Sequence, residues 1–387
     1  MPRVPHKSHS VGFPIYSLAF ISPSRVVLGG GGGSSSKTGV KNKLAVYDIS
    51  SDDITPASTY ELDSADDCPM SLSVPLTNKH HLVAGINTST PPNTNLRLFN
   101  IDGDKLSLES KTQTIYSDDV EAYQRIAEIS PSPTHPIVVV DGKRKEKQES
   151  SFLHTLSFPQ LKQLNEPLQI QGDILSANFS ADGALLAVAT SKQVTVYAVE
   201  SDEKKTVLKE VQSISEPLIR KNPGGSLRYA KFGRGSHTSK LYTITNSAPP
   251  AKKRGARPGF LTAWDTNSWT VIRSVRLADK PVTACDLSED GQLIAFASAD
   301  LSVGIVSAKT LAPLVRILSA HSFPVTCLSF DPTATVLASG SPDNSMRLVQ
   351  VPPDLAAGDS ARAFVQALVI AILIGLLAVL LQLYQRK

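Results

Sequence analysis

The chain has 387 residues, of which 41% are hydrophobic and 19% are charged, and its formal net charge is +4. This composition excludes a largely disordered chain, and the length predicts either several domains or one large repeat fold. So weak a charge gives no reason to expect nucleic acid as a partner. The three cysteines, Cys68, Cys285 and Cys327, are too widely spaced for a disulfide framework or a metal site, so we expect buried, inert thiols in a reducing compartment.

The first distinctive segment is a glycine-rich stretch, residues 29–43, with the sequence GGGGGSSSKTGVKNK. It lies between two short apolar runs, residues 25–28 and 44–47, each of which predicts a β-strand. Glycine loses the most backbone entropy on ordering, so five in a row favour a place where the backbone approaches another group closely. A loop this long between strands is either functional or disordered, and a flexible linker is the alternative.

A recurring pattern follows along residues 1–351: an apolar strand, a turn with Ser-Pro or Asp-Gly, and a second apolar strand ending in small residues. Its equivalent points recur at intervals of about 43 to 55 residues, as propeller repeats do. They are Leu18, Leu72, Ile126, Ala177, Tyr229, Ala284 and Cys327. The sequence therefore predicts an all-β, seven-bladed β-propeller over residues 1–351. Two β-sandwiches would not explain the spacing. We expect residues before Ser17 to pair with the last blade and close the ring.

The repeats are similar to those of WD-repeat proteins, although most copies are degenerate. The similarity lies in Ser-Ala-Asp-Gly at residues 180–183, in Trp264-Asp265, and in Ala320-His321, which approximates the Gly-His of that family. It implies a diverged WD-repeat propeller.

Two inserts between the predicted strands carry runs of charge. Residues 141–151 and 247–258 have loop compositions, and we expect solvated loops at the blade edges, with contact to anionic lipid as the alternative.

The C-terminal part predicts a membrane anchor. Residues 363–383 contain no charge and only two polar side chains, Gln366 and Gln382, which suits a spanning helix. Basic and aromatic residues flank the segment, as they do at membrane interfaces. Residues 352–362 are the predicted linker and 384–387 a short lumenal tail. Because no N-terminal signal peptide is present, we expect a single-pass tail anchor with the propeller in the cytosol; a buried core helix is the alternative.

No motif indicates covalent or hydrolytic chemistry. A phosphate-binding loop requires G-x-x-x-x-G-K-[ST] before a helix, but residues 31–38 have Ser36 in place of the second glycine and a predicted strand follows. The pair His80-His81 lacks a metalloprotease arrangement, and the acidic pairs 66–67 and 118–119 are predicted to be solvated turn residues. We therefore expect an interaction platform and no enzyme active site.

The combination of propeller, C-terminal anchor and glycine-rich loop in the first blade resembles the membrane-bound guanine-nucleotide exchange factors of the Sec-twelve family, which includes the prolactin-regulatory-element-binding protein of animals. The likeness is sharpest at residues 29–33 followed by 37–42. It implies an exchange factor that activates a Sar-type small GTPase at the endoplasmic reticulum membrane and so starts COPII coat assembly. The anchor itself would also suit the mitochondrial outer membrane, and only the resemblance selects the organelle. A membrane-anchored scaffold without exchange activity is the alternative.

The resemblance also implies a role for the loop, which in that family contacts the GTPase and binds a potassium ion. The residues to which this role carries over are Gly30, Gly31, Gly32, Gly33, Lys37, Thr38, Gly39, Val40, Lys41 and Asn42. Thr38 and Asn42 are the side chains most expected to act, and backbone carbonyls would hold the ion. A thousandfold acceleration of nucleotide release requires about 4 kcal/mol of preferential contact with the opened GTPase.

Overall fold

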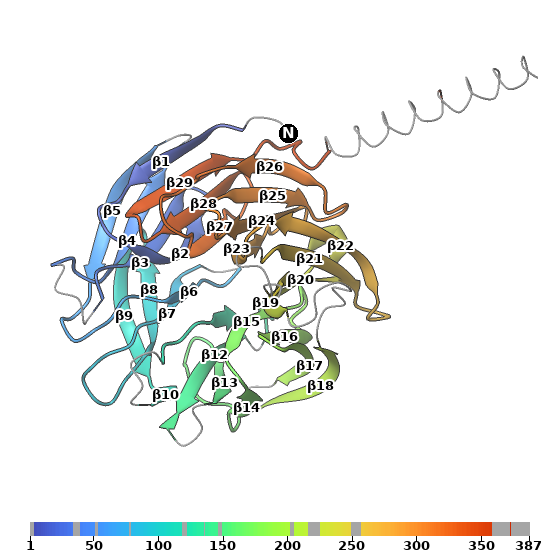
Figure 1. Ribbon diagram of the computed structural model, residues 1–387. Coiled ribbons are helices and arrows are strands. Elements are labelled where there is room, and N and C mark those ends of the chain that lie inside the picture. Colours follow the sequence, from blue (N-terminus) through green and yellow to red (C-terminus); the bar gives the residue numbers. More distant parts are fainter. Residues whose placement is uncertain are drawn as a thin grey trace, which may run out of the picture.

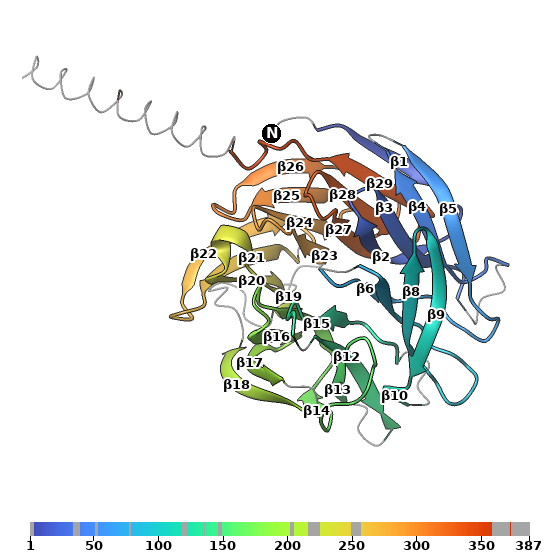
Figure 2. The same cartoon turned by 180° about the vertical axis from the view of Figure 1, so that it is seen from behind.

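The computed structural model describes residues 4–33, 39–50, 53–76, 79–117, 122–134, 136–145, 149–201, 205–215, 225–248, 257–357 and 372. Seven β-sheets within these residues stand around a common axis (Figures 1 and 2). The predicted all-β, seven-bladed propeller is confirmed. Six of the sheets are four-stranded and antiparallel, and the sheet of the third blade has an extra strand.

The blades follow one another along the chain, with the innermost strand first. Blade 1 is β2 (Ile15–Ser22), β3 (Arg25–Gly30), β4 (Lys43–Ile49) and β5 (Ile54–Glu61). Blade 2 is β6 (Ser71–Ser73), β7 (His81–Gly85), β8 (Leu96–Asp102) and β9 (Lys105–Thr112). Blade 3 is β11 (Ala127–Ile129), β12 (Ile137–Arg144), β13 (Ser150–Ser157) and β14 (Leu168–Gln171), and β10 (Ile115–Tyr116) runs parallel to the end of β12.

The remaining blades keep the same order. Blade 4 is β15 (Ile174–Phe179), β16 (Leu185–Thr190), β17 (Gln193–Ser201) and β18 (Thr206–Ser215). Blade 5 is β19 (Ser226–Phe232), β20 (Lys240–Asn246), β21 (Gly259–Asp265) and β22 (Val271–Ala278), with a short 3-10 helix, η2 (Gly235–His237). Blade 6 is β23 (Val282–Leu287), β24 (Leu293–Ser298), β25 (Val303–Ser307) and β26 (Pro313–Ile317). Blade 7 is β27 (Cys327–Phe330), β28 (Val336–Ser341), β29 (Ser345–Gln350) and β1 (His6–Ser10).

The ring is closed by strands from the two ends of the propeller sequence. β1 pairs antiparallel with β29, with His6 opposite Val349, as predicted for the residues before Ser17. The Thr326 hydroxyl also donates a hydrogen bond to the Ile15 carbonyl (2.7 Å), which ties the inner strands of blades 7 and 1 together. Because every blade packs against another blade on both sides, the inner strands form a stiff scaffold.

The hydrophobic core lies between neighbouring blades. The apolar side chains of inner and middle strands are buried against the next sheet; Phe20 and Val26 of blade 1, for example, share a cluster with Ala338 and Leu348 of blade 7. The side chains of the outermost strands alternate between exposed and half-buried, as in β9, or are mostly exposed, as in β22. Each of these interfaces stabilises the ring, because apolar surface removed from water contributes about 25 cal/mol per Å².

The predicted loop at residues 141–151 was wrong in its extent. β12 continues to Arg144 and β13 begins at Ser150, so most of this charged segment is strand. The buried Asp141 carboxylate accepts hydrogen bonds from the backbone N–H groups of Arg125 and Ile126, at 2.8 and 2.9 Å. Composition alone indicated a solvated loop, because the backbone groups that bind Asp141 lie 15 and 16 residues earlier in the chain and leave no local signal.

The predicted anchor at 363–383 and tail at 384–387 lie outside the described residues, apart from Ile372. In the described ranges, no helix is long and apolar enough to cross a membrane. At the start of the predicted linker, Leu355 is buried in a cluster with Val4 and Val351. The chain is therefore held against the rim of the propeller, near blade 7, where it passes beyond β29.

Candidate functional site

The loop between β3 and β4 is shorter than the glycine run predicted. Gly30 pairs with Lys43, so Gly29 and Gly30 are the last residues of β3 and only residues 31–42 form the loop. These two glycines are required by packing, since a Cβ on Gly30 would lie 2.0 Å from the Pro14 carbonyl oxygen and one on Gly29 would lie 2.3 Å from Ser17 Oγ. The placement of Gly30 in the loop was therefore wrong.

Gly31 and Gly33 shape the start of the loop. Their φ angles are +145° and +82°, and a Cβ on Gly31 would lie 2.2 Å from Oδ1 and 2.5 Å from Cα of Asn42. The Gly31 N–H donates to the Pro14 carbonyl (3.0 Å), and the Gly32 N–H donates to the Val40 carbonyl (3.2 Å). Glycine is needed here because the two arms of the loop cross too closely for any side chain.

Asn42 joins the two arms at the base of the loop. Its side-chain oxygen accepts the Gly33 N–H (2.9 Å) and lies 3.2 Å from Cys68 Sγ, and its amide nitrogen donates to the Asp66 carbonyl (2.8 Å). The residue is 9% exposed. The structure thus gives Asn42 a positioning role at the loop base, and direct contact of this side chain with a partner stays a prediction.

Asp66 is itself fixed by a buried ion pair. Arg97, on β8 of the next blade, holds both carboxylate oxygens at 2.7 and 2.5 Å, and the two residues are 4% and 2% exposed. Burial raises the pKa of Asp66, but the hydrogen bonds and charge of Arg97 outweigh it, and the pKa is lowered. Asp66 was predicted to be a solvated turn residue; that was wrong, because its partner is in another blade.

The cysteines agree only in part with the prediction of buried, inert thiols. Cys68 is buried at the loop base, whereas Cys285 and Cys327 are half-buried. Burial raises the pKa of each thiol to about 12, with Asp67 adding to the effect at Cys68. At neutral pH the nucleophilic thiolate is therefore rare in all three.

The other residues that were predicted to act in the loop lie near its base or outside the described residues. Lys37 and Thr38 belong to residues 34–38, which are outside the described residues. Gly39 has φ +74° and open space around its Cα, and Val40 packs against the core between blades 7 and 1. Lys41 is exposed, and its Nζ lies 2.5 Å from Glu61 Oε2.

A cavity of about 740 Å³ lies on the propeller axis, at the face that carries the β3–β4 loop. It is lined by the first residues of the inner strands, and Ile15 at the start of β2 pairs with Gly30 at the end of β3, so both features are at the same end of the blade. Its polar lining includes Tyr16, Arg125 and Arg228. Sequence reasoning missed this site because its members are spread over the whole chain.

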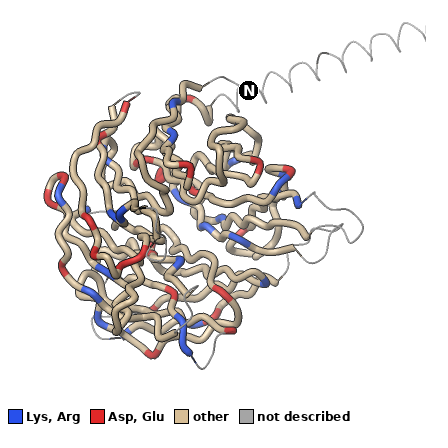
Figure 3. Tube along the Cα trace, turned by 60° about the vertical axis from the view of Figure 1, so that its left-hand side comes forward, with Lys and Arg blue, Asp and Glu red and all other residues tan. Residues whose placement is uncertain are grey.

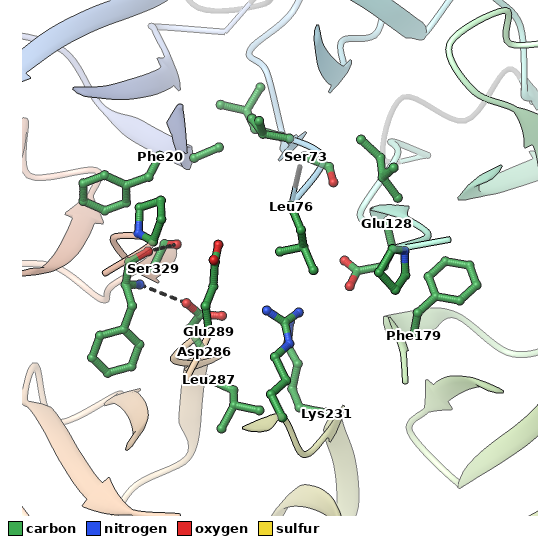
Figure 4. A pocket seen from close by; sticks show the side chains of 18 of the residues that line it. Phe20, Ser73, Leu76, Glu128, Phe179, Lys231, Asp286, Leu287, Glu289 and Ser329 are labelled. Carbon is green, nitrogen blue, oxygen red and sulfur yellow. Dashed lines mark hydrogen bonds between the residues drawn. The ribbon is translucent and has the colours of Figure 1, made fainter. Parts of the chain in front are cut away.

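The opposite mouth of the axis holds a smaller cavity, of about 250 Å³ (Figure 4). Its charges compensate one another: Lys79 Nζ lies 3.6 Å from Glu289 Oε1 across the opening. Burial lowers the pKa of Lys231, but the carboxylates of Glu128 and Asp286 outweigh it and the pKa is raised. We interpret this cavity as structural.

In Figure 3, basic and acidic residues are interspersed along the described trace. Among the described residues, no group of three or more His, Cys, Asp or Glu side chains could hold a metal ion.

The WD-like residues of blade 7 form a buried polar network. His321 Nε2 lies 2.8 Å from Ser339 Oγ, and Nδ1 lies 3.2 Å from an oxygen of Asp343. Asp343 also accepts the Ser322 N–H (2.8 Å), which fixes the connection from blade 6. The segment that matches the WD domain, G-beta repeat family, residues 312–349, runs from the outer strand of blade 6, β26, through β27 and β28 to β29 of blade 7.

The chain is similar over nearly its whole length to two fungal proteins. It is 22% identical over 368 residues to the SED4 protein of Candida glabrata, covering 91% of this chain and 32% of that protein. It is 22% identical over 367 residues to the guanine nucleotide-exchange factor SEC12 of the same organism, covering 90% of this chain and 73% of that protein. The chain thus spans about a third of the former relative and about three quarters of the latter. Over 175 residues, 45% of this chain, it is 23% identical to the guanine nucleotide-exchange factor SEC12 of Mus musculus, of which it covers 41%. These similarities confirm the resemblance to the Sec-twelve exchange factors.

Proposed function

We propose that this protein is a guanine-nucleotide exchange factor for a Sar-type small GTPase, and that it acts at the endoplasmic reticulum membrane to start COPII coat assembly. The observation that carries the proposal is the loop of residues 31–42, anchored on a closed propeller in a chain with exchange-factor homologues. The segment at 363–383 would anchor the protein as a single-pass membrane protein, with the propeller in the cytosol and residues 384–387 in the lumen.

The loop would act by contact alone. An exchange factor shifts its partner only by binding the nucleotide-free state more tightly than the nucleotide-bound state. A base fixed by Asn42 and Asp66 lets the loop press on the nucleotide-sensing segments of the GTPase without first being ordered. Preferential contact of about 4 kcal/mol would accelerate GDP release about a thousandfold.

A potassium ion would suit the same loop. Potassium is bound by oxygen ligands such as backbone carbonyls, and the glycines at 31–33 leave their carbonyls without covering side chains. The Asp67 carboxylate lies beside Gly33, 3.6 Å from the position that a Cβ would take. Carbonyl oxygens of the loop, together with Asp67, are therefore the groups that would hold the ion and fix the loop against the entropy of its glycines.

The test is GDP release from a Sar-type GTPase by the 387-residue chain in liposomes, with a Ras-type GTPase as the specificity control. We expect acceleration for the Sar-type GTPase alone, and a faster rate in potassium than in sodium. The variant Lys37→Ala/Thr38→Ala/Lys41→Ala should lose the acceleration and keep the melting temperature, because it leaves the Asn42 anchor intact. Equal rates in the two salts would remove potassium from the proposal. Spontaneous release in every reaction would leave a membrane-anchored scaffold.

A further inference from the structure

The cavity of about 740 Å³ adjoins the base of the β3–β4 loop. Tyr16 lines the cavity and follows Ile15, which pairs with Gly30. The neighbouring Ser17 hydroxyl donates to the carbonyl of Pro69 (2.7 Å). Pro69 directly follows Cys68, which contacts the Asn42 side chain. The base of the loop and the cavity are therefore neighbours on the same face of the propeller.

The lining has the composition of a protein-binding pocket. Arginine and tyrosine are enriched among the residues that dominate binding energy at interfaces. Here the Arg125 guanidinium lies 4.8 Å from the centre of the Tyr123 ring, and the Arg228 guanidinium lies 5.7 Å from that of Tyr229. The Tyr229 side chain is fixed in position, because its hydroxyl donates a hydrogen bond to the Thr283 carbonyl (2.8 Å).

The two arginines differ in their charge partners. Arg125 is 3.2 Å from Asp173, and Lys143 also binds that carboxylate at 2.5 Å. For Arg228, in contrast, no described residue provides a carboxylate within 4 Å, although the side chain is half-buried at the cavity wall. Among the described residues, Arg228 is thus a cation of the cavity wall that rests on an aromatic ring and has no ion-pair partner within 4 Å.

We propose that this cavity is a second docking subsite for the GTPase, and that it receives a surface segment whose carboxylate side chain pairs with Arg228. The inference rests on the proposed exchange function and deepens it. The lone guanidinium of Arg228 matches one carboxylate better than a multiply charged phosphate, which would need several convergent donors. The cavity is also much larger than a single anion, and its tyrosines suit the apolar part of a peptide segment.

The experiment uses the full chain with the variant Arg228→Glu, and Arg228→Gln as a milder change should the reversal fail to fold. The matched control is Arg273→Glu, the same reversal on the exposed outer strand β22 of the same blade. We expect Arg228→Glu to lower kcat/KM for GDP release about tenfold or more, mainly through KM, because docking is lost while the loop is intact. Its kcat/KM should also depend less on ionic strength, and Arg273→Glu should match the unchanged chain.

The outcomes separate the subsite from the proposed function. Wild-type rates and KM in both Arg228 variants would overturn the subsite and leave the exchange function standing. Equal losses in Arg228→Glu and Arg273→Glu would show general charge steering and would also overturn it. A rise in melting temperature with inorganic phosphate that Arg228→Glu abolishes would assign the cavity to a small anion instead. Absence of exchange by the unchanged chain would overturn both proposals.

Discussion

Replacing Asn42 by alanine tests whether an anchored loop base is needed for exchange. The change removes the acceptor of the Gly33 N–H and the donor to the Asp66 carbonyl. A buried backbone group left without a partner costs about 1–3 kcal/mol. The Gly33 N–H keeps a second partner in the Cys68 sulfur, so the loss falls mainly on the Asp66 carbonyl. We expect a loss of about 1–3 kcal/mol in the free energy of unfolding.

This loss is measurable in a propeller of this size. The unfolding entropy of about 350 residues is about 0.7 kcal/mol/K, so the melting temperature should fall by about 1–4 °C. An unanchored loop occupies its competent conformation for only part of the time, and the apparent affinity for the GTPase falls by that fraction. We therefore expect kcat/KM for GDP release to fall about tenfold to a hundredfold, in proportion to the lost anchoring energy.

Asn95→Ala is the matched control, because Asn95 directly precedes β8 as Asn42 directly precedes β4. It is fully buried, and its side-chain oxygen accepts the N–H groups of Thr114 and Ile115 at 2.9 and 3.1 Å. Its replacement should lower stability by a similar amount and leave exchange nearly unchanged. If Asn42→Ala melts early but exchanges nucleotide at the wild-type rate, or if both variants lose exchange equally, the anchoring argument is refuted.

The glycines, the buried ion pair and the cysteine at the loop base each give a further prediction. Gly31→Ala should cost more than about 2 kcal/mol because its Cβ meets the backbone of the opposite arm, whereas Gly39→Ala, in open space, should cost only about 1 kcal/mol of backbone strain; equal melting temperatures would contradict this. Asp66→Ala should cost about 3–5 kcal/mol in urea unfolding, since Arg97 is left buried without its partner. The lowered pKa of Asp66 means that its contribution is complete above the unfolded-state pKa and is lost as the pH falls through the folded-state pKa; a deficit that persists unchanged at the lowest pH would be inconsistent with this linkage. Cys68, with a pKa of about 12, should react with a disulfide reagent far more slowly in the native chain than in urea, and equal rates would show an accessible thiolate.

The blades were predictable because the strands and turns of each repeat follow from local sequence patterns. Apolar alternation and the Asp-Gly turns mark the first two strands, and at Gly183 the φ of +75° requires the glycine that the sequence provides. The chosen repeat points, such as Leu72 and Ala177, lie in the innermost strands. Ring closure was predictable too, since a propeller with an open blade would expose a strand edge.

The details of the candidate site depend on contacts that no local pattern records. Arg97 comes 31 residues after Asp66, and only the packing of two blades makes the pair. The glycine run was interpreted as one loop because composition does not distinguish a glycine that fits against Pro14 in a strand from one that turns a chain. One signal was available: an asparagine directly precedes the third strand in blades 1 and 2, and a repeated polar residue at one structural position indicates an anchor.

Under the proposed function, the anchored base also explains how a glycine-rich loop would act on a partner. Fixing the backbone of one residue costs about 1–2 kcal/mol, so a partner that had to order about seven further residues at the two arms would have to supply about 7–14 kcal/mol. That exceeds the roughly 4 kcal/mol that a thousandfold acceleration requires. The bonds from Gly31, Gly32 and Asn42 meet this cost during folding, before any partner arrives. In the proposed mechanism, contact energy at the loop is then available to open the nucleotide site of the GTPase, as long as the closed ring keeps Pro14 and Asp66 in place.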